Sequence, residues 1–170
     1  MQIAKCKMKL YRYFVNKKKH NIQLALLSGT ALLLLDIATK LWALSPSFKP
    51  IVFIKDFLYF TEYHTNSGIA FGIKIPMWLQ ITGSIVILII LLDLGYKYIF
   101  SENKRLFIKP ILFGIIIGGA IGNLINRIFQ GYVIDFIVLK PIPVFNIADV
   151  GITIGLIGLF IVLLTQSKKL

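Results

Sequence analysis

Two aspartates in the second half of the chain carry side chains suited to acid–base chemistry. Asp135 lies in a connection between two long apolar runs, and Asp149 lies at the start of the last run. Two carboxyl groups held close together cannot both ionise cheaply, so one keeps a proton and can act as an acid while the other stays charged and can activate water. Asp135 and Asp149 are therefore candidates for a water-activating pair. Taken singly, either aspartate fits a helix cap or a solvated loop acid equally well.

Further polar residues lie within or beside the same apolar runs. Asp36 and Lys40 are four residues apart, as are Asn123 and Arg127, so each pair shares one face of a helix. Ionisable groups inside a membrane span are costly, and each needs a reason to be there. For Asp36 and Lys40, one alternative to a functional role is a neutralising pair whose lysine reaches outward to the membrane surface.

The composition indicates what kind of element must position these residues. Of the 170 residues, 57% are hydrophobic and 15% are charged, and the mean hydropathy is +0.81. Soluble globular chains are nearer ~45–50% apolar and ~25% charged. The excess apolar surface does not fit one core of this size and must largely face lipid. A disordered chain, a soluble enzyme and a disulfide-stapled secreted domain are excluded, and the single cysteine, Cys6, is expected to be incidental.

Four uncharged runs approach the length of a membrane span. About 20 residues of helix cross ~30 Å of hydrocarbon, and helices are required because backbone groups in lipid must be satisfied within the segment. We predict an all-α integral membrane protein with transmembrane helices at Ile22–Leu44, Ile75–Gly95, Ile108–Ile125 and Ile147–Thr165.

Lysine and arginine residues set the orientation of these helices. There are 19 of them against 7 Asp and Glu, and thirteen lie in the first twenty residues, the connection between the second and third helices, and the last residues. By the positive-inside rule, both termini are cytoplasmic. We predict a basic cytoplasmic tail over 1–21, a membrane domain over 22–166 and a short basic cytoplasmic tail over 167–170. No binding module follows the basic N-terminus, so we expect no nucleic-acid partner.

Two connections, residues 45–74 and 126–146, lie on the outer side in this topology. The first is rich in aromatic and β-branched residues, which predicts a small extracytoplasmic β element with a hairpin turning near Lys55–Asp56. The second is apolar and contains Pro141 and Pro143, which suits a segment lying against the membrane surface.

The same topology brings the polar residues together at the outer third of the membrane, while the inner halves of the helices stay apolar. This pattern favours a site that opens to one side. A small transporter or channel subunit, with a polar path lined by Asp36, Lys40 and Arg127, is an alternative, and a purely structural subunit fits less well. His20 and His64 lie on opposite sides, so we expect no metal site and no cofactor.

The polar residues also occur in strings that are similar to those of a known family. The chain resembles bacterial lipoprotein signal peptidase, or signal peptidase II, on five strings in the family's order. They are Asp36-Ile-Ala-Thr-Lys40, Asn66-Ser-Gly-Ile-Ala-Phe71, Gly118-Gly-Ala-Ile-Gly-Asn-Leu-Ile-Asn-Arg127, Val133-Ile-Asp-Phe136 and Phe145-Asn-Ile-Ala-Asp149.

The resemblance implies an aspartyl protease of the bacterial inner membrane. Such an enzyme removes the signal peptide of a prolipoprotein, cutting before a cysteine that carries a diacylglyceryl group. Motif matching makes Asp135 and Asp149 the catalytic pair. It also implies a small outer β element over Ile51–His64, a monomer in contact with membrane lipids, and sensitivity to the cyclic peptide globomycin. The residues that would bind substrate or support the site are Asp36, Lys40, Asn66, Gly68, Ala70, Asn123, Arg127 and Asn146.

One position departs from the family's pattern. The family string commonly ends in Asp-Arg, whereas this chain has Asn126-Arg127. An amide keeps the shape and the acceptor oxygen of a carboxylate but not its charge. Asn126 is therefore not a catalytic acid, and how Arg127 is neutralised is left open.

Overall fold

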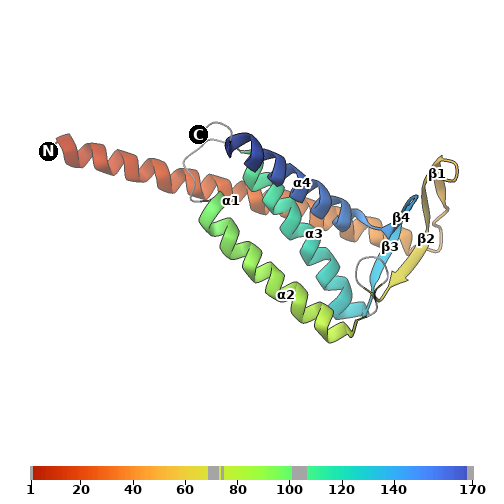
Figure 1. The fold of residues 1–170 in the computed structure, drawn as a ribbon. Helices are drawn as coiled ribbons and strands as arrows, with labels where there is room; N and C mark the ends of the chain where they lie inside the picture. The colour runs from red at the N-terminus through yellow and green to blue at the C-terminus, as the bar shows by residue number, and fades with distance from the viewer. Residues whose placement is uncertain (1, 69–72, 74, 101–106, 168–170) are drawn as a thin grey trace.

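The protein is described here by a computed structural model covering residues 2–68, 73, 75–100 and 107–167 (Figure 1). The described residues form four α-helices and four strands. The order is helix, two strands, helix, and then again helix, two strands, helix, with a short π-helix after the second α-helix. In chain order the elements are α1 Gln2–Ala43, β1 Ile51–Ile54, β2 Leu58–Asn66, α2 Met77–Leu94, η2 Gly95–Ile99, α3 Ile108–Gln130, β3 Val133–Leu139, β4 Ile142–Phe145 and α4 Ile147–Ser167.

The four predicted membrane helices are confirmed as elements. Within the described residues, four helical segments are long and apolar enough to cross a membrane: Val15–Ala43, Met77–Ile99, Ile108–Gln130 and Ile147–Thr165. They differ from the predicted spans mainly at their ends.

Two helix ends were predicted wrongly. Helix α1 begins at Gln2 and not at Ile22, and its N-terminal part projects beyond the other helices (Figure 1). The basic residues there do not interrupt a helix, and no Gly or Pro precedes Gly29. Helix α3 continues through Arg127 to Gln130 and ends where Gly131 adopts the left-handed conformation, at φ 77°.

The sheet is larger than predicted. Its strand order is β1-β2-β3-β4 and every pair is antiparallel. The predicted hairpin is confirmed, and Asp56 at its turn has φ 60°. The second connection forms β3 and β4, two strands that were not predicted, and its position against the membrane surface stays a prediction. Strand β3 is buried from Val133 to Val138 between two neighbouring strands, so its residues, which are apolar except for Asp135, show no alternation of apolar and polar residues.

Helix α3 is the centre of the bundle, and α1, α2 and α4 all pack against it. Glycines allow the close approach, since Gly114 and Gly118 face the backbone of α1 and Gly119 faces Ala148 of α4. Helices in a membrane are not driven together by the hydrophobic effect, because lipid is as apolar as their side chains. Small residues instead let the helix backbones approach closely and gain packing contacts.

An aromatic cluster joins the sheet to the end of α1. Phe136 of β3 is fully buried beside Ala43. Its ring lies edge-on to Phe60 at 5.7 Å and to Trp42 at 6.3 Å between centroids. This contact holds β3 against the end of the helix bundle, and Asp135, the residue before Phe136 on the strand, lines a cavity there.

We predict that Gly118→Ala lowers the stability of the bundle. A Cβ at this position would collide with the backbone oxygen of Gly29, so α1 and α3 must separate. Overpacking of this kind costs about 1–3 kcal/mol. Thermal unfolding of the purified protein in detergent measures the loss.

The matched control is Gly83→Ala on α2, where an added Cβ meets nothing within 4 Å. It should unfold at the same temperature as the wild type or higher, because alanine favours helix over glycine. Equal unfolding temperatures for the Gly118 and Gly83 variants would show that the α1–α3 contact is not tight.

Candidate active site

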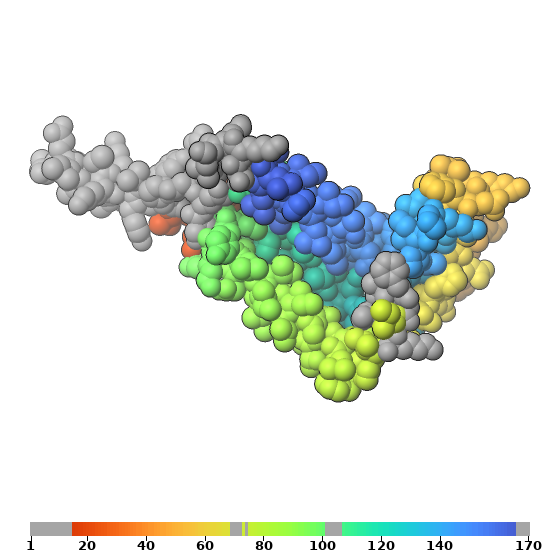
Figure 2. Space-filling view, viewed as in Figure 1, coloured from red at the N-terminus to blue at the C-terminus, as the bar shows by residue number. Residues whose placement is uncertain are grey.

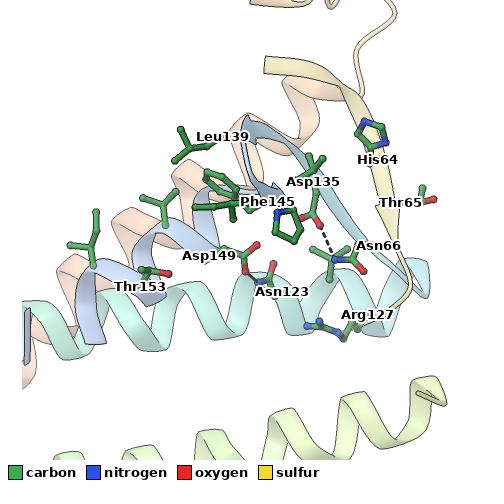
Figure 3. A pocket seen from close by; sticks show the side chains of 16 residues that line it. His64, Thr65, Asn66, Asn123, Arg127, Asp135, Leu139, Phe145, Asp149 and Thr153 are labelled. Atoms are coloured by element: carbon green, nitrogen blue, oxygen red, sulfur yellow. Dashed lines mark hydrogen bonds between the residues drawn. The ribbon is translucent and has the colours of Figure 1, made fainter. Parts of the chain in front are cut away.

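Asp135 and Asp149 line one cavity of about 710 Å³ at the junction of the sheet and the bundle. Asp135 comes from β3, and Asp149 comes from the first turn of α4. Figure 3 shows the two side chains directed into the same space, with Asn123 of α3 beside Asp149. Residues of one strand and two helices are thus brought to one cavity, as the sequence analysis predicted.

Two asparagine amides connect the carboxylates through hydrogen bonds. Asn146 Nδ2 donates to Asp135 Oδ1 at 2.6 Å and to Asn123 Oδ1 at 3.1 Å. Asn123 Nδ2 in turn donates to Asp149 Oδ1 at 2.7 Å. The order along this chain is Asp135, Asn146, Asn123 and Asp149. Each carboxylate is therefore held in place by an asparagine amide, and the two amides are joined to each other by a hydrogen bond.

A capping box fixes the start of α4. Asn146 Oδ1 accepts from the backbone N–H of Asp149 at 3.0 Å, and Asp149 Oδ2 accepts from the backbone N–H of Asn146 at 3.3 Å. This reciprocal arrangement satisfies N–H groups that a helix start would leave without partners. Asp149 thus takes part in the cap of α4 and also lines the cavity. Its interpretation as a helix cap is therefore compatible with a place in a water-activating pair.

Burial controls the acidity of Asp135. Its side chain is only 2% exposed, and on its other side Asn66 Nδ2 donates to Oδ2 at 2.9 Å. Loss of hydration raises the pKa of Asp135 to about 6, a shift to which the nearby charge of Asp149 adds and which the amide hydrogen bonds of Asn66 and Asn146 oppose. Near neutral pH this carboxyl can therefore exchange a proton.

Asp36 and Lys40 form a buried ion pair with an N–O distance of 2.7 Å. Lys40 Nζ also donates to Asn123 Oδ1 at 3.1 Å, and Asp36 Oδ1 accepts from the backbone N–H of Ala148 at 2.9 Å. The alternative in which Lys40 reaches outward is wrong, since Lys40 is 3% exposed. Gly122 of α3 leaves the space that the Asp36 carboxylate occupies. The pair joins α1 to both α3 and α4.

Arg127 lines the cavity and is held by a residue that the sequence analysis missed. Its Nε donates to Gln80 Oε1 of α2 at 3.0 Å. Among the described residues, no carboxylate lies within ion-pair distance of Arg127, so an amide is its partner. A glutamine near the start of a mostly apolar run is the signal that could have indicated this position.

The remaining expected residues are placed as follows. Gly68 is buried, and its backbone N–H donates to Asn66 Oδ1 at 3.0 Å. Ala70 lies outside the described residues. His64, Thr65 and Thr153 also line the cavity and were not among the expected residues.

The cavity combines polar and apolar walls. Besides the amides and carboxyl groups, the lining includes apolar side chains from β3, β4 and α4, among them Leu139, Ile142, Phe145, Val150 and Ile154. A cavity of this kind suits a ligand that is mostly apolar with a few polar groups. Within the described residues, no group of three or more His, Cys, Asp or Glu is placed to hold a metal ion.

Comparisons with known proteins agree on one family. Residues 28–165 match the family model for signal peptidase (SPase) II. A lipoprotein signal peptidase of Clostridium tetani is 42% identical over 142 residues, which cover 79% of this chain and 88% of that protein. A lipoprotein signal peptidase of Staphylococcus carnosus is 33% identical over 162 residues, covering 90% of this chain and 98% of that protein.

Solved structures are similar in fold. A bacterial membrane enzyme determined by the in meso method at 2.3 Å resolution superposes with a TM-score of 0.73 and 29% identity, covering 85% of this chain and 90% of that one. A second such structure, at 1.9 Å resolution, gives a TM-score of 0.69 and 30% identity over 82% of this chain and 92% of that one.

We predict that Lys40→Met strongly destabilises the protein. The substitution leaves Asp36 as a buried charge without its cation, and breaking a buried pair in this way costs roughly 3–5 kcal/mol. Adding Asp36→Asn to Lys40→Met should restore part of the loss. Thermal unfolding in detergent compares the three proteins.

Lys97→Met is the control, because the Lys97–Asp93 pair has the same spacing but is exposed. It should change the unfolding temperature little, since exposed pairs contribute little. If Lys40→Met behaved like Lys97→Met, the buried pair would not carry the α1–α3–α4 junction.

Proposed function

The chain belongs to the signal peptidase II family and is a membrane peptidase, and from that premise we propose how it acts and on what. It removes the signal peptide of diacylglyceryl-modified prolipoproteins, cutting before the lipidated cysteine. Asp135 and Asp149 are its catalytic residues. The observation that carries this assignment is the chain of amides that holds both carboxylates on the wall of one cavity.

The mechanism uses the two carboxyl groups in complementary states. One is ionised and takes a proton from water, which attacks the carbonyl carbon of the scissile peptide bond. The other is neutral, donates a hydrogen bond to the carbonyl oxygen and then helps to protonate the leaving amine. The raised pKa of Asp135, about 6, supports a role in which this carboxyl group gains or loses a proton near the working pH. Asn66, Asn123 and Asn146 keep the carboxyl groups oriented throughout.

The apolar lining of the cavity supports a lipid-modified substrate. Val150 and Ile154 extend the lining along α4 toward the middle of the bundle. Figure 2 shows that part of α3 is visible at the surface between α2 and α4, and we propose that lipid contacts the protein there. The diacylglyceryl chains stay in the lipid there, while the peptide reaches the carboxylates from the aqueous side.

The transporter or channel alternative is not supported by the placement of its key residues. Asp36 and Lys40 pair with each other and with groups of α3 and α4, and Arg127 is bound by Gln80. None of these contacts forms a polar path along the helices.

The chain is a multi-pass bacterial membrane protein. We place it in the cytoplasmic membrane, with residues 1–21 and 167–170 in the cytoplasm and the cavity at the outer surface, as the distribution of Lys and Arg indicates. It acts as a monomer, needs no cofactor, and is inhibited by globomycin.

Asp135→Asn and Asp149→Asn should each abolish cleavage while the protein stays inserted and folded. An amide cannot exchange a proton, and loss of general acid–base catalysis costs about 10²–10⁴-fold in rate. The assay incubates purified protein with lipidated and unlipidated prolipoprotein peptides and detects products by mass spectrometry. Cleavage is expected for the lipidated peptide alone.

Asp56→Asn serves as the control. Asp56 is exposed at the hairpin turn with φ 60°, a conformation that asparagine tolerates, so this variant should keep wild-type activity. Full activity in either catalytic variant would refute the aspartate pair, and equal cleavage of both peptides would refute the lipidated substrate.

The pH profile should respond to the loss of one hydrogen bond. Asn66 donates to the ionised form of Asp135 and so lowers its pKa, which means that Asn66→Ala favours the protonated form. We expect the limb of kcat/KM against pH that lies near pH 6 to move to higher pH in this variant. The apparent value belongs to the coupled pair and is read from the whole profile.

Asn16→Ala is the control, since Asn16 is an exposed residue near the other end of α1. Its profile should overlay that of the wild type. A limb that moved to lower pH in Asn66→Ala would contradict the assigned direction of the hydrogen bond's effect.

A further inference from the structure

Gln80 is an unusual residue for its helix. It is the only buried residue of α2, whose residues are all described, and it is 3% exposed. The rest of α2 is mostly apolar and is exposed or half-buried, as expected of a helix in contact with lipid. A buried polar side chain needs hydrogen-bond partners within the protein, because it has lost its contact with water.

Both N–H groups and the oxygen of the Gln80 amide form hydrogen bonds. Its Nε2 donates to the backbone oxygens of Ser67 at 2.8 Å and Ile75 at 2.9 Å. Its Oε1 accepts from Arg127 Nε at 3.0 Å. Because both N–H groups are taken by carbonyl oxygens, the amide has one orientation, and its oxygen faces the guanidinium group.

This arrangement determines how Arg127 meets the cavity. Arginine has a long side chain with many rotamers, and its planar head donates from two edges. With the Nε edge bound to Gln80, the terminal Nη groups are the donors left for a ligand in the cavity that Arg127 lines. Fixing a side chain before binding reduces the entropy lost when the ligand arrives.

We infer that Gln80 is a positioning residue that presents the guanidinium group of Arg127 to the substrate. It does not line the cavity itself and so acts through Arg127. This inference rests on the proposed function for its consequence in catalysis, but the contact that it invokes can be tested without peptidase activity.

A purely structural role for Gln80 makes a different prediction. In that case it would only attach α2 to the backbone at Ser67 and Ile75, and Arg127 would be a bystander. Gln80→Glu separates the two roles, because glutamate keeps an acceptor for Arg127 but loses both donors to the carbonyl oxygens. Gln80→Met keeps the length of the side chain and removes all three hydrogen bonds.

The first experiment observes the Arg127 Nε–H directly. The chain has three arginines, Arg12, Arg105 and Arg127, so a ¹⁵N spectrum of the arginine Nε groups in detergent micelles is simple, and Arg127→Lys assigns the signal. We expect slow hydrogen exchange at this signal in the wild type and in Gln80→Glu, and fast exchange in Gln80→Met. Gln23→Met, at an exposed position of α1, should leave the signal unchanged. Slow exchange in Gln80→Met would overturn the inference.

The second experiment measures cleavage of the lipidated peptide. Gln80→Met should raise KM about tenfold with kcat nearly unchanged, the result of losing a substrate contact that is present before and during the reaction. Gln80→Glu should keep most of the wild-type KM. In an Arg127→Met background, Gln80→Met should raise KM no further, because residues that act through one another are not additive.

The outcomes distinguish the two proposals. If the wild type cleaves no lipidated peptide, the proposed function fails, and the exchange measurement still decides the role of Gln80. If the wild type cleaves and Gln80→Met lowers kcat alone, or adds its full effect in the Arg127→Met background, the positioning role is wrong.

Discussion

The site depends on satisfying carboxylates that are removed from water. Asp36 and Asp135 are buried and Asp149 is half-buried, and a charge without partners at such positions would be costly. Only Asp36 has a cation as its partner within ion-pair distance. The other two are held by asparagine amides, which supply hydrogen bonds without adding charge. Amides therefore allow both carboxyl groups to stay ordered while either can still lose or gain a proton.

Close helix packing is what brings these partners within reach. Gly122 leaves room for the Asp36 carboxylate against α3, and Gly118 lets the two helices approach just one turn earlier. From there Asp36 reaches the backbone of Ala148, at the start of α4. The glycines thus act on the site indirectly, because they set the distance between helices whose polar groups must meet. If the helices were farther apart, their side chains could not form these hydrogen bonds directly.

Much of this arrangement follows from the sequence, and the exceptions have physical reasons. Charge boundaries locate membrane helices because the cost of burying charge dominates there, and the helix order then brings Asp135 and Asp149 to one level. Strand β3 was missed because burial on both faces removes the alternation that reveals a strand, and β4 was missed because it is only four residues long and contains a proline. Lys40 was misjudged because its inward orientation depends on Asn123, a partner 83 residues away. Gln80 was overlooked because it is uncharged, and only the fold shows that it is the buried residue of α2.

Asn126 illustrates how the charge balance of the site limits its residues. Three carboxyl groups, those of Asp36, Asp135 and Asp149, lie near two basic side chains, Lys40 and Arg127, and in the proposed mechanism a single shared proton balances these charges. A fourth carboxylate one position before Arg127 would add a negative charge in a medium that screens it poorly. The structure also gives it no donor, since Asn126 is buried, its Nδ2 donates to Gln130 and its Oδ1 has no hydrogen-bond partner among the described residues. An orphaned amide oxygen costs less than an orphaned carboxylate. The amide at this position therefore fits a site in which Arg127 is oriented by Gln80 and needs no adjacent acid.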